Sequence, residues 1–246
     1  MTINTKSTMA AISATKRIST GIKGFDKLIS GGFKPNSINL VAGGPGSGKT
    51  IFSIQFLMKG IESGEKVLYI TFEEKRKKLF EDMQDFGWDL SKAEKEGKFT
   101  ILEYTPEKVK KMLAEGGGVL ESMIEKSKVK RIVIDSITSF ALLYRDELTK
   151  KEAALALFEM INKWGCTAVL TAQEEAIESD TVSAALEFEV DSIIIIYHSK
   201  IDGERIRGIE ILKMRGTKHP SKTFRFEILD KKGMCVYSDK IIELNK

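Results

Sequence analysis

A glycine-rich segment, Gly43-Gly-Pro-Gly-Ser-Gly-Lys-Thr50, constrains the fold of this chain more than any other feature. It follows the β-rich run Ser37 to Ala42 and precedes a helical pattern of apolar residues that ends at Gly64. A strand, a glycine loop and a helix in this order form a phosphate-binding loop, in which backbone N–H groups point onto phosphate oxygens. The alternative is a glycine-rich turn that happens to carry Lys-Thr, and the flanking strand and helix argue against it.

The loop predicts ATP as the ligand and Mg²⁺ as its metal ion. We expect Lys49 to reach the β- and γ-phosphates and the Thr50 hydroxyl to ligate Mg²⁺. The residues predicted to hold the nucleotide at this loop are Gly44, Pro45, Gly46, Ser47, Gly48, Lys49 and Thr50.

A second protein ligand for Mg²⁺ is predicted at Asp135, directly after the β-branched run Val129 to Ile134. An Asp at the end of a buried strand is typical of magnesium sites in phosphate-loop enzymes. Asp is also a common turn residue at strand ends, so its position alone leaves a purely structural role open. The phosphate loop upstream favours the metal-binding role.

Two acidic residues, Glu73 and Glu74, follow the strand predicted at Val67 to Phe72. We expect this strand to lie beside the phosphate-loop strand, with its carboxyl end on the ligand side of the sheet. One of the two carboxylates is then the candidate general base for the reaction at the γ-phosphate, and the sequence does not decide which. The alternative is a solvated helix start, where acidic side chains favour the helix dipole.

Apolar strands and helices alternate along the rest of the chain, which predicts an α/β fold with a mostly parallel sheet flanked by helices. After Asp191 the pattern changes to consecutive strand-like segments, which predict an antiparallel extension of the same sheet. Residues 1–17 are polar and predict a flexible tail, followed by one domain over residues 18–246. The further strands are predicted at Thr100 to Glu103, Thr167 to Leu170, Ile193 to Tyr197, Arg207 to Met214 and Thr223 to Leu229, and the further helices at Glu73 to Met83, at Glu152 to Trp164 and within Pro106 to Met123.

We expect a cytoplasmic protein without a membrane anchor, because the longest apolar run, Ile193 to Tyr197, is far short of the roughly 20 residues that cross a bilayer. Hydrophobic residues make up 42% of the chain, and 39 basic against 35 acidic side chains leave a net charge of only +4. This balance gives no strong pointer to nucleic acid. Cys166 and Cys235 lack metal-ligand spacing and are expected to be reduced packing residues.

Several further segments, together with the phosphate loop, resemble the KaiC family within the RecA superfamily of ATPases. The match runs from about Ile18 to Asp230, and its most specific part is the Glu-Glu pair combined with the late Lys-Met-Arg-Gly-Thr-x-His motif. The segments are Gly21-Ile-Lys-Gly-Phe-Asp26, Tyr69-Ile-Thr-Phe-Glu-Glu74, Phe86-Gly-Trp-Asp89, Ile134-Asp-Ser136 and Lys213-Met-Arg-Gly-Thr-Lys-His219.

The resemblance implies a RecA-like core and a single module of a type that occurs twice in the circadian clock protein. In this family ATP binds between adjacent subunits of a homohexameric ring, and the paired glutamates activate water. Carried over, Glu73 and Glu74 are the catalytic pair, and Lys213 and Arg215 reach the γ-phosphate of a neighbouring subunit. The residues implied to lie near the same nucleotide are Thr217, His219 and Asp230, with Asp85 or Phe86 beside the adenine.

The strand pattern independently supports the role of the two late cations. Lys213 and Arg215 alternate on one face of the predicted strand, so both can approach the same negative charge. The alternative is a basic solvent face with Met214 buried between them.

One departure bears on phosphorylation. The second module of the clock protein carries adjacent Ser and Thr at a site where this chain has Glu187 and Phe188. In this respect the chain resembles the purely hydrolytic first module, although Thr181 and Ser183 lie close by.

Three functions follow from these observations. The leading hypothesis is a ring-forming ATPase that regulates an unidentified protein partner through its nucleotide state. A recombinase-like DNA-binding ATPase is the second, although its candidate cluster of Lys200, Arg205 and Arg207 is interrupted by acidic residues. A protein kinase or autokinase is the third.

Overall fold

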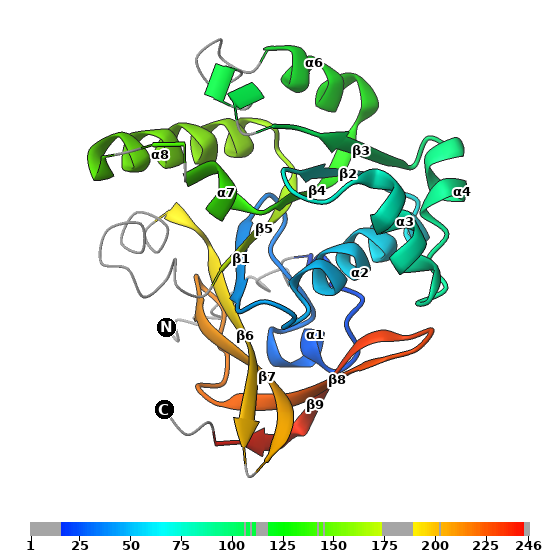
Figure 1. The fold of residues 1–246 in the computed structure, drawn as a ribbon, viewed down its shortest axis with the longest axis vertical. Helices are drawn as coiled ribbons and strands as arrows, with labels where there is room; N and C mark the ends of the chain where they lie inside the picture. Colours follow the sequence, from blue (N-terminus) through cyan, green and yellow to red (C-terminus); the bar gives the residue numbers. More distant parts are fainter. Residues whose placement is uncertain are drawn as a thin grey trace, which may run out of the picture.

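The structure, a computed structural model, describes residues 16–105, 107–108, 110–111, 118–141, 143–144, 146–173, 189–201 and 203–243. In this part of the chain, one nine-stranded sheet has the strand order β3-β2-β4-β5-β1-β6-β7-β8-β9. Figure 1 shows this sheet running through the molecule, with helices packed on both of its faces.

The strands are β1 (Ile38–Gly43), β2 (Lys66–Thr71), β3 (Phe99–Glu103), β4 (Val129–Asp135), β5 (Thr167–Ala172), β6 (Ser192–Ile201), β7 (Glu204–Met214), β8 (Thr223–Leu229) and β9 (Gly233–Ile242). The helices are α1 (Phe25–Leu28), α2 (Lys49–Glu62), α3 (Arg76–Gln84), α4 (Leu90–Lys95), α6 (Gly118–Ser127), α7 (Ile137–Ala141) and α8 (Glu147–Lys163).

The predicted α/β class is confirmed. The strands from β3 to β6 along the sheet are all parallel, and β7, β8 and β9 continue it in antiparallel order. The antiparallel part begins one strand later than predicted, because β6 pairs in parallel with β1. The last strand, β9, was not predicted.

The core lies on both faces of the sheet because successive side chains of a strand point to opposite sides. In β1, Val41 belongs to one hydrophobic cluster, while Leu40 and Ala42 belong to the other. The first cluster receives side chains from α1, α2, α3 and α4, and the second from α6, α7 and α8. All positions of β1 are buried, so the phosphate loop begins from the middle of a covered sheet.

The order of the sheet corrects one prediction. β2 does not lie beside the phosphate-loop strand β1, because β4 and β5 are inserted between them. Sequential strands are neighbours in only about two-thirds of cases, and the crossover through α2 skips two positions here. Glu73 and Glu74 nevertheless follow a parallel strand whose carboxyl end lies at the same edge of the sheet as the loop.

Three segment boundaries also differ from the predicted ones. α3 begins at Arg76, so Glu73 and Glu74 precede the helix and do not form its first turn. α8 begins before the predicted Glu152, because the Asp146 side chain caps it by accepting from the Thr149 N–H. Most of the predicted tail, residues 1–17, lies outside the described residues, but Arg17 is half-buried and hydrogen-bonded. No helix in the described ranges is long and apolar enough to cross a bilayer.

Candidate active site

The phosphate loop joins β1 to α2 and is closed by its own lysine. The Lys49 ammonium donates to the carbonyl oxygens of Gly43 at 2.7 Å and of Gly44 at 3.0 Å. Gly48 has a φ of +110°, a conformation that favours glycine, and a Cβ at this position would approach the Ile228 side chain to 3.0 Å. The loop therefore has the compact backbone that phosphate binding requires.

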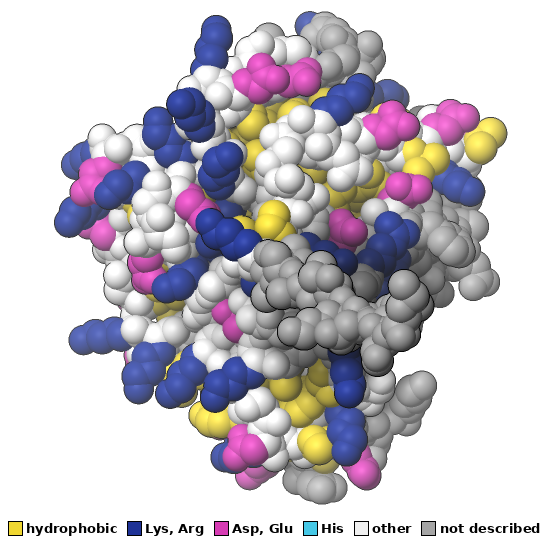
Figure 2. Space-filling view, turned by 180° about the vertical axis from the view of Figure 1, so that it is seen from behind, with side chains coloured by type: hydrophobic (Ala, Val, Ile, Leu, Met, Phe, Trp, Pro, Cys, Tyr) yellow, Lys and Arg dark blue, Asp and Glu magenta, His cyan; other side chains and the backbone are white. Residues whose placement is uncertain are grey.

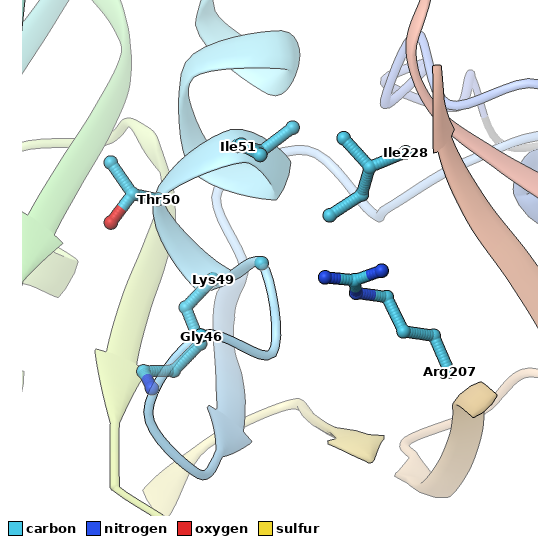
Figure 3. A pocket seen from close by; sticks show the side chains of 7 residues that line it. Gly46, Lys49, Thr50, Ile51, Arg207 and Ile228 are labelled. Atoms are coloured by element: carbon cyan, nitrogen blue, oxygen red, sulfur yellow. The ribbon is translucent and has the colours of Figure 1, made fainter. Parts of the chain in front are cut away.

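A cavity of about 440 Å³ opens beside the loop. Its lining residues are Gly46, Gly48, Lys49, Thr50, Ile51, Arg207 and Ile228. Figure 3 shows Ile51 and Ile228 facing each other across this space, with the Arg207 guanidinium extending from β7 toward the loop. Apolar walls near a charged end suit a nucleotide, whose base is flat and apolar and whose phosphates are anionic.

Arg207 was considered in the sequence only as part of a DNA-binding cluster. In the structure its Nε is buried and has no hydrogen-bond partner among the described residues. A buried donor without an acceptor is costly, so this atom fits an anionic oxygen in the cavity. The sequence did not indicate that Arg207 lies beside the phosphate loop, because only the pairing of β6 with β7 brings it there.

The two predicted metal ligands lie together. The Thr50 hydroxyl donates to Asp135 Oδ2 at 3.1 Å. Two other hydroxyls fix the same carboxylate, Tyr69 at 2.6 Å from Oδ2 and Thr171 at 2.5 Å from Oδ1. Burial, followed by the negative charge of Asp135, raises the pKa of Tyr69 well above its usual value, so Tyr69 remains a hydrogen-bond donor. The roles of Tyr69 and Thr171 at this carboxylate were not predicted from the sequence.

Glu73 and Glu74 lie on the short connection between β2 and α3. Their backbone N–H groups donate to the Thr71 hydroxyl at 3.3 and 3.0 Å, which folds the connection back toward the end of the strand. Glu74 is half-buried, whereas Glu73 is exposed. Burial, followed by the charge of Asp135, raises the pKa of the Glu74 carboxyl. A carboxyl with a raised pKa is a stronger base than an ordinary one once it is ionised.

Two serine hydroxyls hold the Glu73 carboxylate. Ser136, at 3.4 Å, and Ser139 both donate to Glu73 Oε1. The serines follow β4 and are three positions apart, a spacing that places them on one side of a helical turn. That spacing was visible in the sequence, but its relation to Glu73 depends on the pairing of β2 with β4.

Lys213 and Arg215 lie at the opposite end of the strands from the phosphate loop. Met214, at the end of β7, pairs with Ser192, and Ser192 pairs with Asn39 near the start of β1. Asn39 lies four residues before Gly43, where the loop begins, which is roughly 13 Å along β1 at about 3.3 Å per residue. The structure therefore does not bring Lys213 and Arg215 to the phosphate loop of their own chain.

Lys213 and Arg215 do not share one strand face. Lys213 Nζ donates to the Val190 carbonyl oxygen at 3.0 Å, and the Arg215 backbone N–H donates to Asp191 O at 2.8 Å. β7 ends at Met214, so Arg215 lies beyond the strand, on the turn that follows it. The predicted alternation on one strand face is therefore wrong for Arg215.

The remaining predicted nucleotide residues are spread over three places. Thr217 and His219 belong to the turn after β7, where Thr217 accepts from Arg17 and His219 Nδ1 lies 3.3 Å from Pro220 O. Asp230 follows β8, two positions after the cavity residue Ile228. Asp85 directly follows α3, and Phe86 stacks on Trp88 at a centroid distance of 5.2 Å.

None of these five residues is among those that line the cavity. Their roles at a nucleotide therefore stay predictions. Glu187 and Phe188, with Thr181 and Ser183, lie outside the described residues, so the predicted loss of the phosphorylation site also stays a prediction.

The donor set at Thr50 and Asp135 fits Mg²⁺ bound together with a nucleotide. Within the described ranges, no group of three or more His, Cys, Asp or Glu side chains could form a metal cage of protein ligands alone. Mg²⁺ commonly keeps only one or two protein groups and takes its other ligands from phosphates and water. One hydroxyl and one carboxylate beside a phosphate loop match this pattern.

Comparisons with known proteins agree with the family resemblance found in the sequence. A family model described as "ATPase: KaiC" matches residues 18–241. A UPF0273 protein of Thermotoga maritima is 36% identical, and the alignment covers 90% of this chain and 96% of that protein. The circadian clock protein KaiC3 of Synechocystis is 35% identical over 94% of this chain, which corresponds to 47% of its own length.

A solved structure extends the comparison to the fold. The crystal structure of a KaiC-like protein from Pyrococcus horikoshii is 36% identical, with a TM-score of 0.80. The alignment covers 91% of this chain and all of that chain. The whole arrangement of core and antiparallel extension is therefore similar in the two proteins.

Proposed function

Since this chain belongs to the KaiC family of ATPases, we propose that it binds ATP with Mg²⁺ and hydrolyses it at sites formed between neighbouring copies. The juxtaposition of Thr50 and Asp135 beside the phosphate loop carries this proposal. It joins residues from two distant segments into the hydroxyl and carboxylate pair that phosphoryl-transfer enzymes place at Mg²⁺.

The charges around the cavity suit the phosphates of ATP. Thr50 and Asp135 would hold Mg²⁺, which supplies charge neutralisation for the β- and γ-phosphates. Lys49 lies in the loop, and the unpartnered Nε of Arg207 faces the same cavity. These groups attract and orient the polyphosphate, with Ile51 and Ile228 beside the less polar part of the nucleotide.

The carboxylates of Glu73 and Glu74 have different environments, which suggests different roles. Ser136 and Ser139 orient Glu73, whereas Glu74 is half-buried and has a raised pKa. We assign Glu74 the role of the base that accepts a proton from the attacking water, and Glu73 the role of orienting that water. Proton transfer to a positioned carboxylate contributes about 10²–10⁴-fold to such reactions.

The position of Lys213 and Arg215 supports a site shared between copies. They lie at the edge of the sheet opposite to the loop of their own chain, yet they carry the positive charge expected beside a transferring phosphoryl group. A neighbouring copy that places this edge against the cavity would supply both cations. Such a head-to-tail contact repeats around a closed ring, and the ring we propose has six members.

A regulatory role is the proposed use of this hydrolysis, with a protein partner that distinguishes the nucleotide states. The surface favours this role over DNA binding. Figure 2 shows Lys and Arg side chains scattered over one face with Asp and Glu between them, not gathered in one basic groove. Single-stranded DNA binding requires a positively charged groove with aromatic stacking residues. The chain is proposed to act in the cytoplasm.

The direct test is release of inorganic phosphate from ATP by the purified full chain with Mg²⁺, using Lys49→Ala as the inactive control. We expect steady phosphate release that depends on Mg²⁺ and no label on the protein when γ-labelled ATP is supplied. Labelled protein without free phosphate would instead identify a kinase. Retention on single-stranded DNA that is lost with added salt would identify the recombinase-like alternative.

A further inference from the structure

The segment before α1 contacts the turn that follows β7. Arg17 Nη1 donates to the Thr217 hydroxyl oxygen at 3.0 Å, although the two residues are 200 positions apart. The same nitrogen lies 3.4 Å from the Gly32 carbonyl oxygen. The Arg17 guanidinium therefore bridges the N-terminal segment and the late motif that carries Arg215.

The N-terminal side of this bridge is fixed. Ile18 and Phe33 exchange two backbone hydrogen bonds, each of 2.9 Å. The buried Arg131 donates to the Ser19 carbonyl oxygen at 2.7 Å. Because the backbone next to Arg17 is anchored at two successive residues, the guanidinium can hold the turn in place.

The other side of the bridge is a tight turn, in which the Thr217 N–H donates to Met214 O at 3.3 Å. Gly216 has a φ of +60°, and a Cβ at this position would come within 2.5 Å of Lys34 Nζ, so Lys34 lies against the turn. The Arg215 N–H donates to Asp191 O at 2.8 Å, which fixes the start of the turn to the beginning of β6. Arg17 supplies the corresponding attachment at Thr217.

The direction of this hydrogen bond determines what the Thr217 hydroxyl can do. A guanidinium has only donors, so the Thr217 oxygen is the acceptor. Its own hydrogen remains available to donate, and the acceptor that suits it is an oxygen of an anionic ligand.

We infer that Arg17 is a positioning residue for the nucleotide site of the neighbouring copy. It orients the Thr217 hydroxyl and holds the turn that carries Arg215 in the geometry needed to meet that nucleotide. This inference rests on the proposed function, in which the turn after β7 faces the cavity of the next subunit. Arg17 of one copy would then act at the nucleotide site of the next copy.

The first test compares Arg17→Met, which keeps the aliphatic stem but removes the donors, with Arg17→Lys, which restores one charged donor. Loss of a charge-assisted hydrogen bond predicts a fall in kcat of about tenfold for Arg17→Met, and Arg17→Lys should recover part of it. The KM for ATP should change far less than kcat, because the loop in the same chain is intact. Lys16→Ala removes an exposed neighbouring charge and should leave the rate unchanged. An unchanged kcat in Arg17→Met would overturn the inference.

A double-mutant cycle with Thr217→Val tests whether Arg17 acts through the threonine. Valine has nearly the shape of threonine but cannot accept the hydrogen bond. Arg17→Met should cause little further loss of kcat in the Thr217→Val background. Fully additive losses of kcat would show that Arg17 does not act through Thr217.

Mixed assemblies separate this inference from the proposed function. Coexpression of Arg17→Met with the Glu73→Gln/Glu74→Gln double variant should restore activity, as should coexpression of Arg215→Ala with the same double variant. Restoration in the Arg215→Ala mixture but not in the Arg17→Met mixture would overturn the role of Arg17 and leave the proposed function in place. Failure of both mixtures would contradict the shared site of the proposed function.

Discussion

The hydroxyl of Thr50 and the carboxylate of Asp135 lie 3.1 Å apart, although 85 positions separate them in the sequence. Thr50 lies in the first turn of α2 and Asp135 ends β4, and the sheet between them determines their distance. Because Tyr69 and Thr171 also donate to Asp135, this carboxylate is oriented before any ligand arrives. Such preorganisation lowers the cost of ordering the site when a ligand binds.

Removing the Thr50 hydroxyl should weaken the Mg²⁺-dependent part of ATP binding. We expect Thr50→Ala to lower the affinity for ATP with Mg²⁺ by about 10–100-fold, by analogy with the loss of groups that support metal ligands. Affinity without Mg²⁺ should change little. Isothermal titration with and without Mg²⁺ measures both quantities, with Thr50→Ser as the matched control that keeps the hydroxyl. An equal effect of Mg²⁺ on Thr50→Ala and the unmodified chain would argue against Thr50 as a ligand.

Removing both carboxylates should separate binding from hydrolysis. The Glu73→Gln/Glu74→Gln variant is expected to lose at least about 10²-fold in kcat, because no positioned base remains to accept the proton. Its affinity for ATP, measured by titration, should stay within a few-fold, because neither residue lines the cavity at the loop. Hydrolysis at the original rate would remove the pair from the mechanism.

The raised pKa of Glu74 predicts the pH dependence of hydrolysis. The base acts in its ionised form, so the rate should fall as the pH falls through the pKa of Glu74. Since burial and Asp135 raise this pKa, the fall should occur at a higher pH than for an ordinary carboxyl. Rate measurements across pH at saturating ATP should show this acidic limb in Glu73→Gln. If it also persists in Glu74→Gln, another group is responsible.

Two glycines with positive φ test the packing of the N-terminal segment against β9. Gly24 and Gly64 have φ values of +83° and +78°, but a Cβ on Gly24 would lie 1.9 Å from Val236 O, whereas Gly64 has open space. Both Ala variants should incur the cost of about 1–2 kcal/mol for left-handed backbone. Gly24→Ala should lose roughly a further 1–3 kcal/mol through overpacking. Unfolding free energies from urea titrations give the comparison, and equal losses would mean that the contact with Val236 is absent.

The strands and the loop were predictable because their signals are local. Runs rich in β-branched residues, such as Val129 to Ile134, predict buried strands, and the glycine spacing of the loop requires a strand before it and a helix after it. The end of β9 carries no such signal, since residues 237–243 are mostly exposed and polar. The short helix α4 had a capping signal in Asp89, whose side chain accepts from the Lys92 N–H at 2.8 Å.

The arrangement of the site could be predicted only in part. Thr50 and Asp135 were paired from the chemistry of Mg²⁺ sites, but the contacts of Ser139 with Glu73 and of Arg17 with Thr217 join segments whose proximity depends on strand order. Strand order is set by crossovers that bury both faces of the sheet, and a periodic pattern in one segment does not encode it.

Activity in a mixed assembly tests whether the hydrolytic site is shared between copies. Arg215→Ala and the Glu73→Gln/Glu74→Gln variant should each be nearly inactive alone. When they are coexpressed at equal levels, roughly a quarter of the interfaces should combine an intact loop side with an intact cation side, because each interface takes one side from each of two copies. A shared site predicts that phosphate release returns to about that fraction of the unmodified rate. Activity no higher than that of the separate variants, in an assembly shown to contain both, would contradict it.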